Sequence, residues 1–230
     1  MSATSTTDTT RAREAMVDAI AADHARLGQP PLSPAVERAL RTVPRHRFLP
    51  GLPTAEAYDH EQAVVTKEEN GLALSSVSAP SIIATMLHRA DLGRGQHVLE
   101  IGSGGYNAAL IRELVGPFGQ VTSIDIDSDV IVRAEELLAD AAAEGVHLAV
   151  ADGEHGFAAR APFDRIIVTA GAWDLPPRLG HPARPRRAPG RPDADTRTHP
   201  LPHPGTYRRP RALASRGRGP LRVRPHAGRR

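Results

Sequence analysis

The residues best suited to chemistry form a glycine-rich turn followed by acids at regular intervals. Residues 98–109 read Val-Leu-Glu-Ile-Gly-Ser-Gly-Gly-Tyr-Asn-Ala-Ala, an apolar run that passes through an acid into clustered glycines. Glycines let a backbone turn tightly and approach a ligand closely. Asp125 ends the next apolar run, and Asp152-Gly153 ends the one after it. Three acids at successive strand ends beside such a turn predict a site for a cofactor that contains a nucleoside.

The spacing alone leaves two cofactors open, because Asp125 follows Gly105 by 20 residues, as in dinucleotide-binding proteins. The NAD fingerprint, however, spaces three glycines around a pyrophosphate, whereas Gly102, Gly104 and Gly105 are packed together. S-adenosyl-L-methionine has no phosphate to hold, and its cationic amino acid end favours carboxylates. We therefore favour S-adenosyl-L-methionine over NAD.

Each acid has an expected partner on this cofactor. Glu100 would supply negative charge near the amino acid end, and Asp125 would accept hydrogen bonds from the ribose hydroxyls. Asp152 would face the adenine, with Gly153 admitting the flat ring. One acid at a strand end is more often a helix cap or a solvated residue, so the prediction depends on all three. The predicted cofactor-binding residues are Glu100, Gly102, Ser103, Gly104, Gly105, Tyr106, Asp125, Ile126, Asp152 and Gly153.

Alternating strands and helices must position these residues. The apolar patterns predict strands at 97–101, 120–125, 146–150 and 164–170, with helices at 107–115 and 128–144. Such alternation implies right-handed crossovers and an α/β fold, a Rossmann-like doubly wound parallel sheet with strand order 3-2-1-4. Upstream, we expect an N-terminal helical extension with helices at 11–27, 33–42 and 81–88, whereas 58–74 is polar and predicted to be irregular.

Bulk composition excludes several classes of protein. The chain has 230 residues and no cysteine, so it has neither disulfides nor thiolate metal sites. No apolar stretch approaches the roughly 20 residues of a membrane span, and the N-terminus lacks a secretory pattern. We expect a cytoplasmic protein without membrane contact. His60, His88 and His97 have no partner at ligand spacing, so no metal site is predicted.

The chain changes character near Pro177. Residues 178–230 contain 15 Arg, 10 Pro and no Lys, with a net charge of +13, which leaves −10 for residues 1–177 of the total of +3. The tail could be a basic arm that binds nucleic acid, or merely a solvated segment. We favour a third interpretation, a shift of reading frame in a GC-rich gene, because one shifted frame can encode Gly-Gly-Arg-Leu followed by an apolar strand.

These boundaries divide the chain into three parts. Residues 1–92 form a helical extension with a loop on the substrate side, residues 93–177 an S-adenosyl-L-methionine-binding α/β half-domain, and residues 178–230 a basic tail predicted to be disordered or frameshifted. The sheet would then lack its C-terminal strands. An uncovered apolar strand at 165–169 is an aggregation site, so we expect poor stability.

Several segments between residues 11 and 177 resemble the protein-L-isoaspartate O-methyltransferase family. Val43-Pro-Arg-His-Arg-Phe-Leu-Pro50 resembles its N-terminal signature, and Ser76-Val-Ser-Ala-Pro80 resembles the loop beside its methyl donor. Residues 98–109, 150–153 and 163–170 resemble its cofactor motif, adenine segment and fourth strand. The resemblance implies a class I methyltransferase fold and transfer of a methyl group to an L-isoaspartyl or D-aspartyl carboxylate of a protein or peptide.

The resemblance also implies a role for Ser78, whose hydroxyl would hydrogen-bond the substrate carboxylate. Capping of the helix that begins at Pro80 is an alternative role. The glycine turn is one residue shorter than in the family, and the loop before Ser78 lacks its Pro-Ile-Gly approach. In these two departures the chain resembles relatives that methylate an aspartate in ribosomal peptide natural products. A truncated, inactive product with residual cofactor binding is a further alternative.

Overall fold

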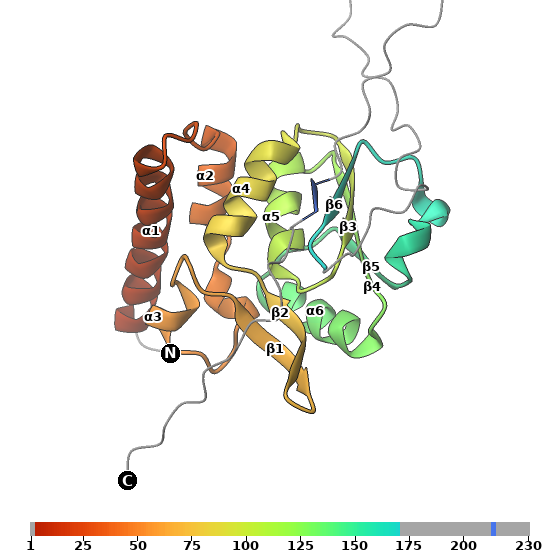
Figure 1. The fold of residues 1–230 in the computed structure, drawn as a ribbon, viewed down its shortest axis with the longest axis horizontal. Helices are drawn as coiled ribbons and strands as arrows, with labels where there is room; N and C mark the ends of the chain where they lie inside the picture. Colours follow the sequence, from red (N-terminus) through yellow and green to blue (C-terminus); the bar gives the residue numbers. More distant parts are fainter. Residues whose placement is uncertain (1–2, 171–212, 215–230) are drawn as a thin grey trace, which may run out of the picture.

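The computed structural model describes residues 3–170 and 213–214, in which a parallel sheet lies beside layers of helices (Figure 1). Its strands lie in the order β5-β4-β3-β6-β7, and all neighbours are parallel. The strands are β3 (His97–Ile101), β4 (Gln120–Asp125), β5 (Val146–Val150), β6 (Arg165–Val168) and β7 (Leu213–Ala214). The first four reproduce the predicted order 3-2-1-4.

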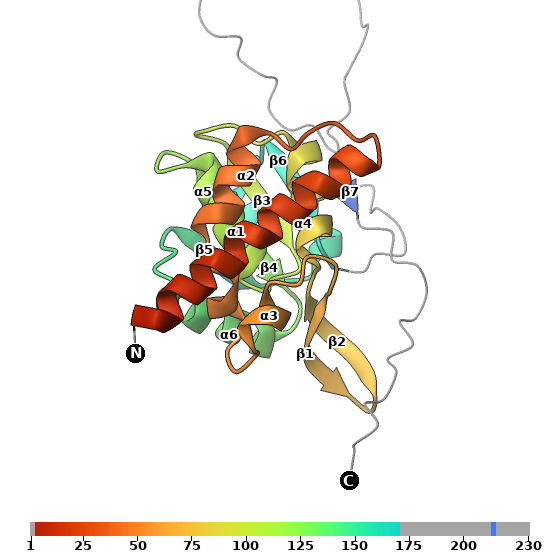
Figure 2. The ribbon, with the colours of Figure 1, turned by 90° about the vertical axis from the view of Figure 1, so that its left-hand side faces the viewer.

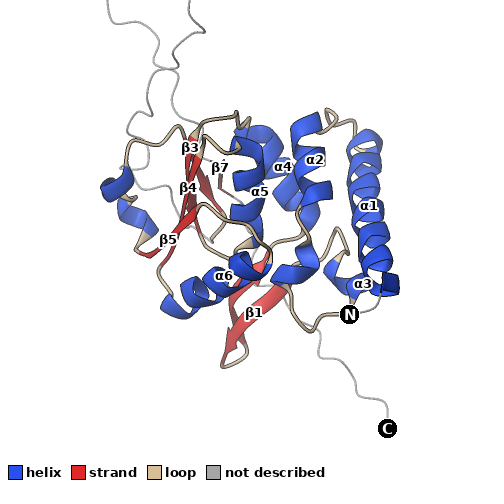
Figure 3. Cartoon of the chain, turned by 180° about the vertical axis from the view of Figure 1, so that it is seen from behind, coloured by secondary structure: helices blue, strands red, loops and turns tan. Residues whose placement is uncertain are grey.

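The two faces of the sheet are covered differently. Side chains alternate between the faces along a strand, so Val98 joins a large apolar cluster and its neighbour Leu99 joins a small one. The large cluster contains residues of α4 (Pro80–Ala90), α5 (Tyr106–Val115) and α6 (Ser128–Asp140). These three helices therefore lie on one face, as seen from behind in Figure 3. Within the described residues, the α-helices cover only that face, and the other face packs against Phe157 and Phe163, beside the short 3-10 helices Gly153–His155 and Ala158–Arg160.

The N-terminal helices join the same apolar cluster. Helix α1 (Ala3–Arg26) crosses α2 (Pro34–Thr42) and α4 obliquely (Figure 2). Ser33 caps α2 by accepting a hydrogen bond from the Val36 amide, and Pro34 takes the first helical position, as the sequence predicts. Because Ile20 and Leu40 share a core with Val98, the extension packs as one body with the sheet, and the boundary at residue 92 stays a prediction.

The prediction of an irregular segment over 58–74 is wrong. Strands β1 (Val64–Glu69) and β2 (Leu72–Val77) pair antiparallel in a hairpin that projects from the body (Figure 2). Asn70 and Gly71 both have positive φ at the turn, at +52° and +78°. Asn-Gly is the commonest sequence of such two-residue turns, and Val64-Val65-Thr66 has high strand propensity. The many charges after Thr66 obscured this signal.

Three smaller differences concern the ends of two helices and the outer edge of one strand. Helix α1 begins at Ala3 instead of residue 11, and α6 ends at Asp140, before Ala142 adopts a positive φ of +53°. The outer edge of β6, expected to be bare, is paired at Ile167 and Val168 with the two residues of β7. The other predictions for residues 178–230 lie outside the described residues. Among those described, no helix is long and apolar enough to cross a membrane.

Candidate active site

The glycine turn after β3 packs closely against the end of β6. Gly102 has a φ of +98°, and a Cβ there would lie 2.6 Å from the Ala170 amide nitrogen. The Thr169 hydroxyl donates to the Gly102 carbonyl at 2.7 Å and so ties the two segments together. Gly105 also has a positive φ, +80°, and a Cβ there would meet the Phe48 ring at 3.1 Å. Both positions therefore require glycine for conformational and packing reasons.

Glu100 is fully buried at the end of β3. The Asn107 amide donates to one carboxyl oxygen at 2.7 Å, and the Ser123 hydroxyl donates to the other at 2.5 Å. Burial raises the pKa of Glu100 to about 7, against the opposing effect of these two bonds, and the nearby Asp125 raises it further. Both oxygens are thus bonded inside the protein, and the predicted role of Glu100 in cofactor binding stays a prediction.

Asp125 stands at the end of β4 and organises the loops around it. The Ser103 amide donates to one carboxylate oxygen at 2.9 Å, and the Asp127 amide donates to the other at 3.0 Å. The side chain of the next residue, Ile126, is 72% exposed. The structure therefore places the predicted ribose acceptor beside the glycine turn, with an apolar side chain in solvent next to it.

Asp152 and Gly153 lie at the end of β5, as predicted, but the structure gives both a local role. Asp152 accepts a hydrogen bond from the Glu154 amide at 2.9 Å and caps a short 3-10 helix, Gly153–His155. A Cβ on Gly153 would lie 2.2 Å from Cγ2 of Ile101. Glycine is thus required for packing against Ile101, whereas the proposed contact of this segment with adenine stays a prediction.

A cavity of about 260 Å³ brings Ser78 together with the glycine turn. Its lining includes Ser78, Glu100, Gly104 and Asp125. A second cavity of about 280 Å³ adjoins it and shares the residues Ser75, Val77, Ser103 and Gly104. Helix α4 has no side-chain cap, and its N-cap residue is Ala79. The capping alternative for Ser78 is therefore wrong, and the residue lines the cavity.

Gly104 differs from its neighbouring glycines. Its φ is not positive, and a Cβ there would contact only Val77 Cγ2, at the ordinary distance of 3.7 Å. Neither strain nor crowding within the described residues explains the glycine. Because Gly104 borders both cavities, its missing side chain leaves room for a ligand against the backbone.

Tyr106 is fully buried beneath the turn, and its main neighbour was missed in the sequence. The guanidinium of Arg45, itself 0% exposed, lies 5.0 Å from the centre of the Tyr106 ring. Arg45 donates through Nε to the Ala57 carbonyl at 2.9 Å, while burial lowers its pKa. Phe48 also packs against the Tyr106 ring, with centroids 5.6 Å apart. The segment around Arg45 and Phe48 therefore supports the glycine turn from below.

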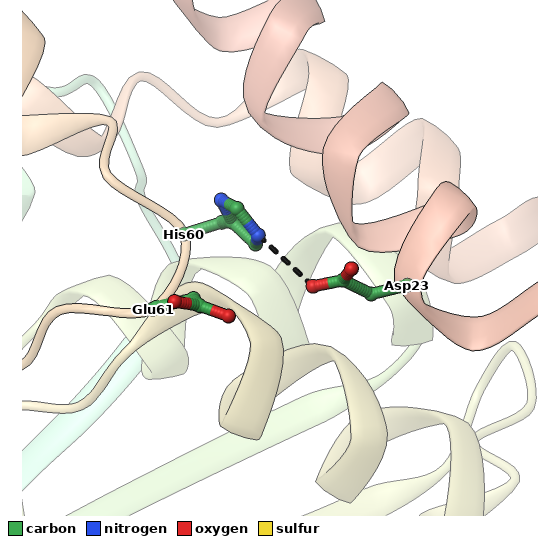
Figure 4. Close-up of side chains that lie close together, drawn as sticks. All are labelled: Asp23, His60 and Glu61. Carbon is green, nitrogen blue, oxygen red and sulfur yellow. Dashed lines mark hydrogen bonds and ion pairs between the residues drawn. The ribbon is translucent and has the colours of Figure 1, made fainter. Parts of the chain in front are cut away.

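His60, which has no partner at ligand spacing in the sequence, does have one in the structure. Ligand atoms of Asp23, His60 and Glu61 lie within 4.8 Å of one another (Figure 4). His60 Nε2 lies 3.1 Å from one Asp23 oxygen, and Arg26 donates to the other at 2.8 Å. A cation would have to displace both bonds, so we assign these residues the structural role of joining α1 to the loop before β1.

Comparison with known proteins points to one family. The sequence profile of protein-L-isoaspartate(D-aspartate) O-methyltransferase matches residues 25–181. The protein-L-isoaspartate O-methyltransferase 2 of Archaeoglobus fulgidus is 40% identical over 156 residues, which are 67% of this chain and 68% of that protein. The protein-L-isoaspartate O-methyltransferase of Opitutus terrae is 42% identical over 142 residues, which are 61% of this chain and 57% of that protein.

Solved structures agree on the fold. A protein-L-isoaspartate O-methyltransferase structure superposes with a TM-score of 0.62 at 27% identity, over 72% of this chain and 50% of that one. A Plasmodium falciparum structure described under the same enzyme name, in complex with S-adenosyl-L-homocysteine, superposes with a TM-score of 0.58 at 17% identity. The superposition covers 73% of this chain and 77% of that one. The chain thus matches between half and about three quarters of the length of these relatives.

Proposed function

The chain belongs to the protein-L-isoaspartate(D-aspartate) O-methyltransferase family, and on that premise we propose that it methylates a carboxylate with S-adenosyl-L-methionine as donor. The acceptor would be an L-isoaspartyl or D-aspartyl residue of a protein or peptide. One observation carries the proposal: the glycine turn and Asp125 line the same cavity as the Ser78 hydroxyl. Donor-binding groups and an acceptor-binding hydroxyl therefore face one space.

The residues present suit S-adenosyl-L-methionine. The open side of Gly104 leaves room for a ligand against the backbone. The buried Glu100 carboxyl lines the same cavity, and a cationic amino acid end bound beside it would favour its ionised form. Asp125 would bind the ribose hydroxyls, and Ile126 with Asp152-Gly153 would border the adenine. Ser103, Gly102, Gly105 and Tyr106 would shape the turn. When bound, the cofactor supplies a methyl group on a positively charged sulfur.

The chain's own residues have a limited task in this reaction. An acceptor carboxylate has a pKa near 4 and is already ionised at pH 7, so no side chain has to remove a proton. The Ser78 hydroxyl would donate a hydrogen bond to that carboxylate and orient one oxygen toward the methyl group. Catalysis would then depend on alignment of the two reactants, with the hairpin and the glycine turn as the opposing walls.

The hairpin favours a second candidate substrate class. Strand β2 leads directly to Ser78, and residues 66–71 before it lack the family's Pro-Ile-Gly approach. This departure supports the alternative that the acceptor is an aspartate of a ribosomal peptide natural product. A non-catalytic product that only binds the cofactor is the remaining alternative. We also propose a cytoplasmic location and no nucleic acid partner for this chain.

Methyl ester formation tests the proposal. The full chain is incubated with labelled S-adenosyl-L-methionine and three peptides of one sequence, containing L-isoaspartate, D-aspartate or L-aspartate. We expect labelled ester on the first two and little on the third, and a reduced rate for Ser78→Ala. Ester on L-aspartate alone would favour the natural-product alternative. Binding of S-adenosyl-L-homocysteine without any transfer would favour the non-catalytic alternative.

A further inference from the structure

The hairpin is fastened to the body through β1. Lys67 Nζ donates to Asp127 Oδ2 at 2.5 Å and to Asp129 Oδ2 at 2.9 Å, both at the start of α6. From the next turn of α6, Arg133 donates to the Thr66 carbonyl at 3.0 Å. The free carbonyl of Thr66 lies where the pairing register shifts between Val65 and Lys67. Strand β1 is thus held on one side by α6 and on the other by β2.

Strand β2 has an unpaired edge. Its only strand partner within residues 3–170 and 213–214 is β1, so the backbone groups along its other edge have no ladder. The cavity beside the glycine turn is lined by the consecutive residues 73–78. Successive side chains in a strand point to opposite faces, so a cavity that meets six residues in a row meets the strand along its edge. The unpaired edge of β2 therefore faces the cavity.

We propose that the free edge of β2 binds the main chain of the acceptor peptide as an added, extended strand. This inference rests on the proposed function, because the acceptor is the peptide that carries the methylated carboxylate. An unpaired edge supplies main-chain hydrogen bonds to any extended sequence, which suits an enzyme whose target is a carboxylate. At the C-terminal end of the same edge lies Ser78, in the same cavity as Gly104. A strand on β2 would thus bring the free carboxylate of its isoaspartyl residue to the glycine turn.

Exposed leucines on β2 provide a second contact. Leu72 is 66% exposed and Leu74 is 52% exposed, and Leu74 also lines the cavity. Apolar side chains next to an unpaired edge normally promote association, and here they would cover apolar neighbours of the acceptor residue. We therefore expect apolar residues close to the aspartyl position to favour binding.

Peptides with single N-methylated amides test this inference in the full chain. A nine-residue isoaspartyl peptide is synthesised with one N-methyl group at each amide in turn, and KM is measured for methyl transfer. An added strand points every second amide toward β2, so we expect KM to rise about fivefold at alternate positions on one side of the acceptor. A flat profile, or equal increases at adjacent positions, would overturn the inference.

A variant pair tests the leucine contact. Leu74→Ser should raise the peptide KM about fivefold and leave the affinity for S-adenosyl-L-homocysteine unchanged. Leu27→Ser is the matched control, because Leu27 is 58% exposed and lies just after α1. Equal KM values for the two variants would count against the inference.

The proposed function and the inference fail in different ways. Absence of both cofactor binding and transfer would refute the proposed function. Normal transfer with a flat N-methyl profile would refute only the added strand. If the cofactor binds without transfer, anisotropy of the labelled N-methyl peptides in the presence of S-adenosyl-L-homocysteine gives the same alternate or flat pattern and decides the inference.

Discussion

The two walls of the cavity are built in opposite ways. On the strand-end wall, Glu100 is fully buried with both carboxyl oxygens bonded, and Gly102 fits against the Ala170 backbone. On the hairpin wall, Leu72 and Leu74 are exposed, and salt bridges of a partly exposed Lys67 hold the strand pair to the body. Close packing fixes one geometry, whereas surface ion pairs contribute little. The first wall suits an invariant cofactor and the second suits varied peptide sequences.

Among changes to the strand-end wall, replacing Glu100 should alter the free energy of unfolding most. Its pKa is raised from 4.5 to about 7 by burial, so the folded state keeps a proton that the unfolded chain releases. Stability then falls as pH rises from about 4.5 to about 7, by about 3 kcal/mol at 1.36 kcal/mol per pH unit. Glu100→Gln cannot ionise and can bond both Asn107 and Ser123, so it should remove this decrease.

The check is the unfolding free energy from urea titrations at pH 5 and pH 8. Glu135→Gln, an exposed residue of α6, is the control and should retain the wild-type difference between the two pH values. An unchanged difference in Glu100→Gln would mean that the buried carboxyl does not resist ionisation.

A pair of glycine variants separates packing from ligand space within this wall. Gly102→Ala combines a φ of +98° with a contact of 2.6 Å to backbone, and should lower the unfolding free energy by about 2 kcal/mol. Gly104→Ala meets nothing closer than 3.7 Å. It should fold with unchanged stability and bind S-adenosyl-L-homocysteine more weakly. Equal stability of the two variants in urea titrations would contradict the described turn.

Asp125→Ala should weaken cofactor binding, with a smaller change in free energy than the changes expected for Glu100 and Gly102. It removes the predicted ribose acceptor and the bonds from the Ser103 and Asp127 amides. The loss of charged hydrogen bonds predicts roughly 10- to 30-fold weaker binding of S-adenosyl-L-homocysteine by calorimetry. Glu136→Ala, at an exposed position on α6, should bind like the wild type. Wild-type affinity in Asp125→Ala would remove this residue from the site.

Loosening the attachment of the hairpin should have the smallest effect, and this effect should appear only in the KM for the peptide. Lys67→Met removes the bonds to Asp127 and Asp129, and should raise the peptide KM about two- to threefold. The increase should shrink at high salt, where the wild-type ion pairs are screened. Arg11→Met breaks a surface pair with Asp8 on α1 and serves as the control. A change in cofactor affinity for Lys67→Met would contradict the separation of the two walls.

The two walls also differ in how far the sequence predicts them. The apolar run ending at Glu100 and the acids Asp125 and Asp152 predict the sheet order and the cofactor edge, because strand and turn signals there are local. The hairpin had an equally local signal in Asn70-Gly71. Charged residues such as Lys67 are typical of loops, however, and led to the prediction of an irregular segment. Lys67 has its partners, Asp127 and Asp129, at the start of α6, and the distance in sequence conceals these pairs.

Other parts of the site depend on contacts that no local pattern encodes. The stacking of Arg45 on Tyr106 joins residues 61 positions apart in the sequence. The contact of His60 with Asp23 joins residues 37 positions apart. The end of the family match at residue 181 lies close to the compositional change near Pro177. This coincidence supports the hypothesis of a shifted reading frame, which a fresh read of the DNA encoding residues 176–192 would test.

An NMR titration of backbone amides tests the central claim, one wall for each reactant, most directly. Adding S-adenosyl-L-homocysteine to the labelled chain should shift Ser103, Gly104 and the amides after Asp125. Adding the isoaspartyl peptide afterwards should shift residues 73–78 most, with smaller shifts in the glycine turn, which the acceptor carboxylate approaches. Peptide shifts confined to other surfaces, or cofactor shifts that avoid the glycine turn, would contradict the account.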